Sequence, residues 1–335
     1  MHRSTNNNGD STCLILTDSL KYRIPGEAVV EKYGEFCIDY DTEEPKGFVV
    51  SEFVSNAIYS FQEGIVKGEL LSFQTEEPYI ISKEEYLNDA DTVLNAFDST
   101  ELQKVVLSRI KKVDFDESKS ELLFNELVIS YPNAFVYLIS SKLFGTWIGA
   151  TPEILLVTAL HSGFTMALAG TKKADDSSEW ESKEKEEQQF VTDFIQSKLI
   201  ENNYKHVDLS GPFETIAGPI KHLRTDVSFD FESGNALKTI RTLHPTPAIS
   251  GLPQKEAISL ILEIEKHERV FYTGFIGLMN QNKNQIYVNL RCCQIQKGAA
   301  YLYLGGGFTK DSIPELEWQE TENKSKTLLN ILQKL

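Results

Sequence analysis

The sequence predicts an α+β fold, because strands and helices are mixed without the regular strand–helix alternation of a parallel α/β protein. Apolar residues at helical spacing indicate two helices, at residues 184–199 and 315–332. Runs rich in β-branched and aromatic residues, bounded by turn residues, indicate strands. The clearest strands are expected at residues 103–110, 275–279, 285–293 and 300–304.

The 335 residues are enough for one large domain or two ordinary ones, and no internal repeat divides them. Residues 1–11 are polar and Asn-rich, which predicts a disordered tail. We expect one folded domain at 12–335, with a variable N-terminal part (12–100) and a part that carries the motifs described below (101–335). The polar stretch 172–189 reads as an exposed loop that leads into a helix, not as a domain linker.

The predicted strands carry several polar side chains, and the strand pattern indicates which of them share a face. The strand at 103–110 begins at Lys104. The strands at 275–279 and 285–293 are expected to form a hairpin across an Asn-rich turn. Because side chains alternate along a strand, one face of its second arm would carry Tyr287, Asn289, Arg291 and Cys293. The last strand, at 300–304, runs into three consecutive glycines.

The two predicted helices carry acidic residues on faces that ought to be apolar. Glu184 and Glu187 are three residues apart, on a face that continues through Val191, Phe194 and Ile195, so Glu187 should point toward the core. In the second helix, Glu317, Glu320 and Lys324 fall on one stripe. The sequence Ser312-Ile-Pro-Glu315 before it has the spacing of a capping box.

Charge and cysteine content exclude several classes of protein. The formal net charge of −16 disfavours nucleic-acid and anionic-membrane partners, which need a positive field. An anionic substrate stays possible, because a metal or a local cluster of bases can reverse the field inside a cleft. Four cysteines without CxxC spacing, no export signal and no membrane-length apolar run predict a cytoplasmic protein with free thiols.

The paired carboxylates suggest a metal site. An acid-rich helix is usually a solvated face, but a carboxylate on the core side is costly unless it is paired or metal-bound. Two helices that each offer two carboxylates suit a hard divalent ion. Mg²⁺ takes one or two protein carboxylates, keeps several waters, and accepts further oxygens from an anionic substrate.

Eight segments together resemble the chorismate-binding family of isochorismate, salicylate, anthranilate and aminodeoxychorismate synthases. They occur in the family's order and span roughly residues 100–335. The resemblance implies a single large α+β domain of layered antiparallel sheets with outer helices, like anthranilate synthase component I. The segments are 103–109 (QKVVLSR), 149–156 (GATPEILL), 167–171 (ALAGT), 183–188 (KEKEEQ), 244–251 (HPTPAISG), 289–292 (NLRC), 304–308 (LGGGF) and 317–321 (EWQET).

By this resemblance, Lys104 is the general base that takes a proton from water attacking C2 of chorismate. Glu153 is the general acid that protonates the departing C4 hydroxyl, which requires a pKa raised by its surroundings. A base lysine must be neutral for part of the time, which burial or a cationic neighbour such as Arg109 would favour.

The resemblance also implies ligands for Mg²⁺ and for the substrate. Glu187 and Glu320 match the metal ligands, with Glu184 and Glu317 as direct or water-mediated partners. Arg291 and Lys324 match positions that hold substrate carboxylates. His222 matches a family histidine near the ring, although a lone histidine is more often structural. Tyr272 is a further pocket candidate, with packing in the core as the alternative. The remaining expected substrate-binding residues are Gly170, Thr171, His222, Ala248, Tyr272, Gly305 and Gly307.

Three positions favour isochorismate synthase within the family. Lys104 implies water as the nucleophile, Ala169 stands where one type of aminodeoxychorismate synthase has lysine, and Ala248 stands where salicylate and anthranilate synthases have threonine. A salicylate synthase and a catalytically idle chorismate-binding protein stay open as alternatives. The resemblance implies a monomer without an amidotransferase subunit, whose product would feed menaquinone, siderophore or salicylate synthesis.

The chain also departs from the family pattern. The first metal helix usually reads Lys-Asp-Arg-x-Glu-His, whereas Glu184, Lys185 and Gln188 stand here. The Arg-rich segment after Gly-Thr is replaced by Lys172 and Lys173, and the loop that follows is shorter. These changes affect the contacts expected above the pocket, and they leave the metal and acid–base assignments in place.

Overall fold

The computed structural model describes residues 17–40, 45–64, 75–281 and 283–335. The predicted tail at 1–11 lies outside them. All strand pairings within the described residues are antiparallel and form one sheet. The strands are β1 (Asp18–Arg23), β2 (Val30–Asp39), β3 (Gly47–Ser51), β4 (Ile58–Glu63), β5 (Lys104–Asp114), β6 (Phe135–Ser141), β7 (Gly145–Thr151), β8 (Ile154–Ala159), β9 (Ser162–Lys173), β10 (Asp208–Ala217), β11 (Ile220–Asp230), β12 (Gly251–Leu252), β13 (Phe275–Met279), β14 (Lys283–Val288), β15 (Cys292–Gln296) and β16 (Ala299–Phe308).

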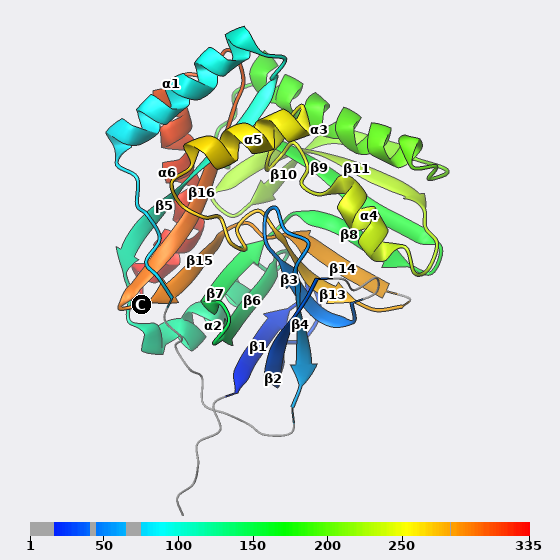
Figure 1. The fold of residues 1–335 in the computed structure, drawn as a ribbon, viewed down its shortest axis with the longest axis vertical. Coiled ribbons are helices and arrows are strands. Elements are labelled where there is room, and N and C mark those ends of the chain that lie inside the picture. The colour runs from blue at the N-terminus through cyan, green and yellow to red at the C-terminus, as the bar shows by residue number, and fades with distance from the viewer. Residues whose placement is uncertain (1–16, 41–44, 65–74, 282) are drawn as a thin grey trace, which may run out of the picture.

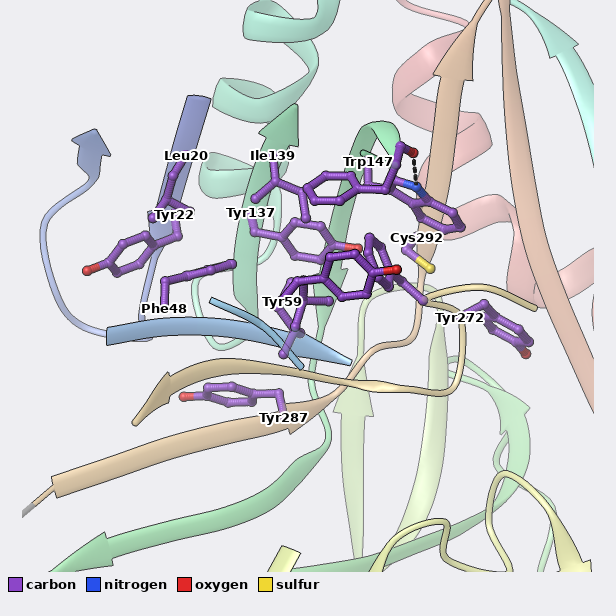
Figure 2. Close-up of a cluster of buried hydrophobic side chains, with 14 of the residues drawn as sticks. Leu20, Tyr22, Phe48, Tyr59, Tyr137, Ile139, Trp147, Tyr272, Tyr287 and Cys292 are labelled. Atoms are coloured by element: carbon purple, nitrogen blue, oxygen red, sulfur yellow. Dashed lines mark hydrogen bonds between the residues drawn. The ribbon is translucent and has the colours of Figure 1, made fainter. Parts of the chain in front are cut away.

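The sheet folds back on itself around an aromatic core. Its strand order is β10-β11-β9-β8-β14-β13-β3-β4-β2-β1-β6-β7-β15-β16-β5-β12, so β13 and β16 are far apart in the sheet. Nevertheless, one buried cluster contains Ile276 from β13 together with Tyr301 and Tyr303 from β16. Figure 2 shows the core of this cluster around Tyr59, Tyr137 and Trp147, with Tyr272 at its end. The predicted layered antiparallel sheets are therefore confirmed.

Six α-helices of the described part of the chain cover the outer faces (Figure 1). Helices α3 and α4 pack on β8, β9 and β11, α2 on β6 and β7, α6 on β16, and α5 on β5. These helices bury apolar residues against the sheet, whereas α1 packs mainly on α6. Their bounds are α1 (Lys83–Ser99), α2 (Ser120–Ser130), α3 (Ser182–Glu201), α4 (Ala236–Leu243), α5 (Gln254–Ile264) and α6 (Pro314–Leu332).

Two local predictions are wrong. The second arm of the hairpin does not continue to residue 293, because β14 ends at Val288 and β15 pairs with β7 and β16 instead. Arg291, with a φ of 50°, lies in the break between these strands. The expected capping box is also absent from the described start of α6, where the N-cap is Ile313 and the Ser312 hydroxyl accepts from the Thr309 N–H.

Other sequence inferences are confirmed. Both long helices occur at the expected places, and Glu187 on α3 is buried. Cys292 and Cys293 face opposite sides of β15, in different core clusters, and both are free thiols. None of the helices in the described residues is both long and apolar enough to cross a bilayer.

Candidate active site

A cavity of about 730 Å³ brings most of the predicted site residues together. Its walls come from β5, β9, β11, β16, α3, α6, the turns that follow β7 and β14, and the loops at 248–249 and 272–273. Helices α3 and α6, which are far apart in sequence, contribute one carboxylate each. The predicted residues that line the cavity are Lys104, Glu153, Gly170, Thr171, Glu187, His222, Ala248, Tyr272, Arg291, Gly305, Gly307, Glu320 and Lys324.

Lys104 stands at the start of β5 with its side chain 2% exposed, and its Nζ lies 3.1 Å from Oε1 of Glu187. Glycine at position 307 is what permits this pair. A Cβ there would lie 2.2 Å from Glu187 Oε1 and 3.2 Å from Lys104 Cε, so any larger residue would displace the carboxylate. Close packing of β16 on β5 therefore brings the lysine and the carboxylate into contact.

Arg109 does not assist Lys104, contrary to expectation. The two side chains project from opposite faces of β5, because their positions differ by an odd number, five. Arg109 instead donates to Thr321 and Glu322 on α6, and its guanidinium stacks 3.8 Å from the centre of the Trp318 ring. Its role is to fasten α6 to β5.

Glu153 lies between β7 and β8, and its carboxyl group is buried against the cavity. Burial raises the pKa of Glu153 to about 7, although Lys104, Arg291 and Lys324 act in the opposite direction. The group therefore carries a proton for a substantial part of the time near neutral pH. A carboxyl group that is partly protonated near neutral pH and a buried lysine therefore line the same cavity.

Replacing Glu153 with glutamine is expected to stabilise the fold at alkaline pH. The folded pKa, about 7, is above the reference value of 4.5, so the favourable contribution of the protonated carboxyl is complete below pH 4.5 and is lost as the pH rises through 7. At pH 8.5 glutamine should raise the free energy of unfolding by up to about 3 kcal/mol, since one pKa unit corresponds to about 1.4 kcal/mol.

Urea denaturation of both proteins at pH 5 and pH 8.5 measures this difference. An exposed change on α3, Glu186→Gln, reports the general effect of removing one negative charge. A Glu153→Gln protein that gains no more stability at pH 8.5 than at pH 5 would contradict the buried, high-pKa carboxyl.

Arg291 lines the cavity and has no carboxylate within ion-pair distance among the described residues. Its Nη2 lies 3.4 Å from Nε2 of His222, while His222 Nδ1 lies 2.7 Å from the Gly170 carbonyl oxygen. A carbonyl only accepts, so Nδ1 carries the hydrogen and Nε2 accepts from the arginine. Burial, together with Arg291, lowers the pKa of His222 to about 3, which keeps the ring neutral. His222 thus orients Arg291.

Lys324 and Glu320 form a second ion pair at the cavity, with Nζ 2.6 Å from Oε1 one helical turn away. Lys324 also donates to the Gly305 carbonyl at 2.9 Å. Burial would raise the pKa of Glu320, but the positive charges of Lys324, Lys183 and Arg291 together outweigh burial, so the pKa is lowered. Glu320 therefore remains ionised.

Glu184 and Glu317 are predicted residues that do not line the cavity. Glu317 is 1% exposed and accepts from Lys183, a partner that the sequence reasoning overlooked although it precedes Glu184 directly. Burial and the Glu320 carboxylate raise the pKa of Glu317 to about 7. Glu184 is half-buried, with one carboxylate oxygen lacking a hydrogen-bond partner within the described structure.

This group of carboxylates fits a hard cation in its chemistry. Each of Glu187, Glu317 and Glu320 has an ammonium partner. Burial first, and then repulsion from the Glu320 carboxylate, raise the pKa of Glu317. Among residues 17–40, 45–64, 75–281 and 283–335, no three acidic, histidine or cysteine side chains converge as a preformed cage. One or two carboxylates are nevertheless enough for Mg²⁺, which retains water ligands.

Several lining residues were missed by the sequence reasoning. Val106, Ile249 and Leu290 lie within the quoted segments and Thr273 lies outside them, but none of the four carries a charge that would have marked it as a cavity residue. Tyr272, which was predicted, both lines the cavity and ends the aromatic core (Figure 2). Gly170 has a φ of +67°, a conformation that favours glycine, and a Cβ there would lie 3.0 Å from Cβ of Glu184.

Comparison with known proteins agrees with this geometry. The family model for chorismate binding enzymes matches residues 57–333. Isochorismate synthase EntC of Escherichia coli (strain K12) is 29% identical over 244 residues, 69% of this chain and 62% of EntC. Isochorismate synthase MenF of Bacillus subtilis (strain 168) is 28% identical over 265 residues, 75% of this chain and 56% of MenF. This chain thus spans less than two thirds of each relative.

Solved structures share the fold. The menaquinone-specific isochorismate synthase MenF from Escherichia coli superposes with a TM-score of 0.79 at 18% identity, over 94% of this chain and 89% of MenF. Anthranilate synthase component I from Streptococcus pneumoniae TIGR4 has a TM-score of 0.67 at 15% identity, over 98% of this chain and 94% of the other. With the family match over most of its length, the chain belongs to the chorismate binding enzyme family.

Proposed function

We propose that this protein is an isochorismate synthase that uses Mg²⁺. The observation that supports this most is one cavity combining a buried lysine, a carboxyl group with a pKa of about 7, and an arginine without a carboxylate partner among the described residues. The named relatives EntC and MenF are isochorismate synthases, in agreement with this proposal.

In the proposed reaction, Lys104 removes a proton from a water molecule whose oxygen bonds to C2 of chorismate. The ring double bonds shift, the C4–O bond breaks, and Glu153 gives its proton to the departing hydroxide, which leaves as water. One hydroxyl is added and one is lost, so the product has the mass of the substrate. Lys104 ends protonated and Glu153 ionised, and proton exchange with solvent resets both.

The same cavity offers groups for the two carboxylates of chorismate. Arg291, held by His222, can grip a carboxylate with two parallel hydrogen bonds, and Lys324 adds a second positive charge. In the proposed metal site, Glu187 and Glu320 would hold Mg²⁺, with Glu184 and Glu317 as direct or water-mediated partners. Bound Mg²⁺ would supply the positive charge that holds the ring carboxylate and relieves repulsion among these groups.

The direct test is to incubate the protein with chorismate, with and without Mg²⁺, and to separate the products by chromatography with mass detection. A Mg²⁺-dependent isomer of unchanged mass would support the proposal. Salicylate plus pyruvate would identify a salicylate synthase and would show that Ala248 does not discriminate the two activities. A folded protein that binds chorismate without converting it would be the idle member of the family.

Removing one proposed ligand should weaken metal binding. Glu320→Gln keeps the shape of the side chain but removes a negative charge, so we expect Mg²⁺ affinity to fall by at least about 10-fold. Titration calorimetry measures this without turnover. Glu315→Gln, near the start of the same helix and paired with Lys83 at the surface, is the matched control. Equal affinities in the two variants would remove Glu320 from the site.

Location and assembly are also part of the proposal. The free thiols of Cys37, Cys292 and Cys293 are compatible with a reducing, cytoplasmic environment. Water as nucleophile needs no ammonia-supplying subunit, so we expect a monomer to be active by itself. Sedimentation tests whether the protein is a monomer, and the activity assay on the same sample tests whether that monomer is active by itself.

A further inference from the structure

A buried ion pair outside the catalytic cavity joins the end of α5 to the turn before β13. Arg269 Nε lies 2.8 Å from Glu265 Oε2, and Arg269 Nη2 lies 2.6 Å from Glu265 Oε1. Both side chains are 3% exposed. The two hydrogen bonds fix the plane of the guanidinium group. Lysine, which is a point charge without a planar group, could not be oriented in this way.

The remaining bonds of the pair go to three segments that line the cavity. Arg269 Nη2 donates to the Val106 carbonyl of β5 at 2.6 Å, and Nη1 donates to the Ile249 carbonyl at 2.9 Å. Arg269 Nη1 also lies 3.3 Å from the Thr273 hydroxyl. Val106, Ile249 and Thr273 are all cavity-lining residues.

Glu265, the second member of the pair, also contacts β5. Its Oε1 accepts from the Ser108 N–H of β5 at 2.7 Å, and the Ser108 hydroxyl lies 2.9 Å from Nε2 of the buried His267. Two consecutive same-face positions of β5, 106 and 108, are therefore held by this ion pair. Lys104 is the next same-face position along that strand.

We propose that the Glu265–Arg269 pair is a positioning element that sets the place of Lys104 in the cavity. This inference rests on the proposed function, in which Lys104 is the base. Neither residue of the pair lines the cavity, so neither touches substrate. A displacement of about 1 Å at a reacting group can cost about 100-fold in rate, so loose anchoring of β5 would slow the chemical step.

The pair should affect turnover more than substrate binding. Its hydrogen bonds go to β5, to residue 249 and to residue 273, and within the described structure none goes to His222, Arg291 or Lys324. The groups proposed to hold the substrate carboxylates keep their own bonds, because Arg291 contacts His222 and Lys324 donates to the Gly305 carbonyl. Loss of the pair is thus expected to lower kcat and leave KM nearly unchanged.

The position of Arg269 also allows its guanidinium group, once removed by mutation, to be replaced by free guanidinium ions. Glu265 and Arg269 form part of the lining of a surface hollow of about 960 Å³, separate from the catalytic cavity. The guanidinium lies 4.3 Å from the centre of the Phe53 ring, on the same hollow. An Arg269→Ala protein would therefore have a guanidinium-sized space that guanidinium ions can reach from solution.

The experiment compares wild-type protein, Arg269→Ala and Arg269→Lys in steady-state conversion of chorismate, with rates expressed per folded molecule. We expect kcat of Arg269→Ala to fall about 100-fold with KM within about threefold. Millimolar guanidinium should restore at least a tenth of the lost rate and leave the wild type unaffected. Arg269→Lys, which keeps charge but not the planar fork, should lie between the two.

Arg23→Ala is the matched control for burial. Arg23 is 4% exposed and donates to the Tyr131 and Pro132 carbonyls, away from β5, so its loss should lower stability and spare kcat. Unchanged kcat in folded Arg269→Ala or Arg269→Lys, or guanidinium that restores melting temperature but not kcat, would overturn the positioning role. A wild-type protein that makes no isochorismate would instead defeat the proposed function, before any variant is compared.

Discussion

Replacing Lys104 with alanine is expected to reduce isochorismate formation by about 10²–10⁴-fold while chorismate still binds. Lys104 is the buried amine on the cavity wall, and its removal leaves no positioned base for the attacking water. The substrate carboxylates would still meet Arg291 and Lys324. Single-turnover rates and equilibrium binding of chorismate, measured on the same preparation, separate the two effects.

The control for this change lies on the same strand. Lys112 is half-exposed, pairs with Glu77 at the surface and is remote from the cavity wall, so Lys112→Ala should turn over like the wild type. Turnover by Lys104→Ala at the wild-type rate would remove the base assignment. Loss of both turnover and chorismate binding would show that the lysine holds the substrate rather than activating water.

The core-facing carboxylate of this site could be predicted from the residues themselves, whereas the acid, base and substrate-binding assignments came from the family resemblance. Glu187 occupies an apolar helix face, where a carboxylate needs a partner, and the structure provides Lys104. The layered antiparallel fold followed from the family resemblance, which extends over most of the chain. The two long helices followed from periodicity alone.

The remaining features depend on long-range contacts that no local pattern shows. The sequence 285–293 alternates like one strand, but Arg291 adopts a positive φ and the chain passes from β14 to β15 there. Lys183 on α3 pairs with Glu317 on α6, a contact between distant parts of the chain that no local pattern indicates. Glu265 and Arg269 carried no motif, and their importance appears only through the strands they connect.

Glu153→Gln should remove the proton donor and, with it, the decline in rate at alkaline pH. The proposed acid acts only when protonated, and burial raises its pKa to about 7, so wild-type kcat/KM should fall as the pH rises above 7. Glutamine has no proton to give at any pH in this range. We therefore expect rates about 10²–10⁴-fold lower and no decline centred near pH 7.

Glu317 provides the decisive comparison, because its pKa is also raised to about 7 but it lies outside the cavity wall. If Glu153 is the acid, Glu317→Gln should retain the alkaline decline in kcat/KM even where its metal affinity is changed, whereas Glu153→Gln should lose it. The profiles are measured at saturating Mg²⁺, so that metal binding does not shape them. Suppose instead that the decline survives in Glu153→Gln and disappears in Glu317→Gln. The group that titrates near pH 7 would then be Glu317, and Glu153 would not be the acid that protonates the departing hydroxyl.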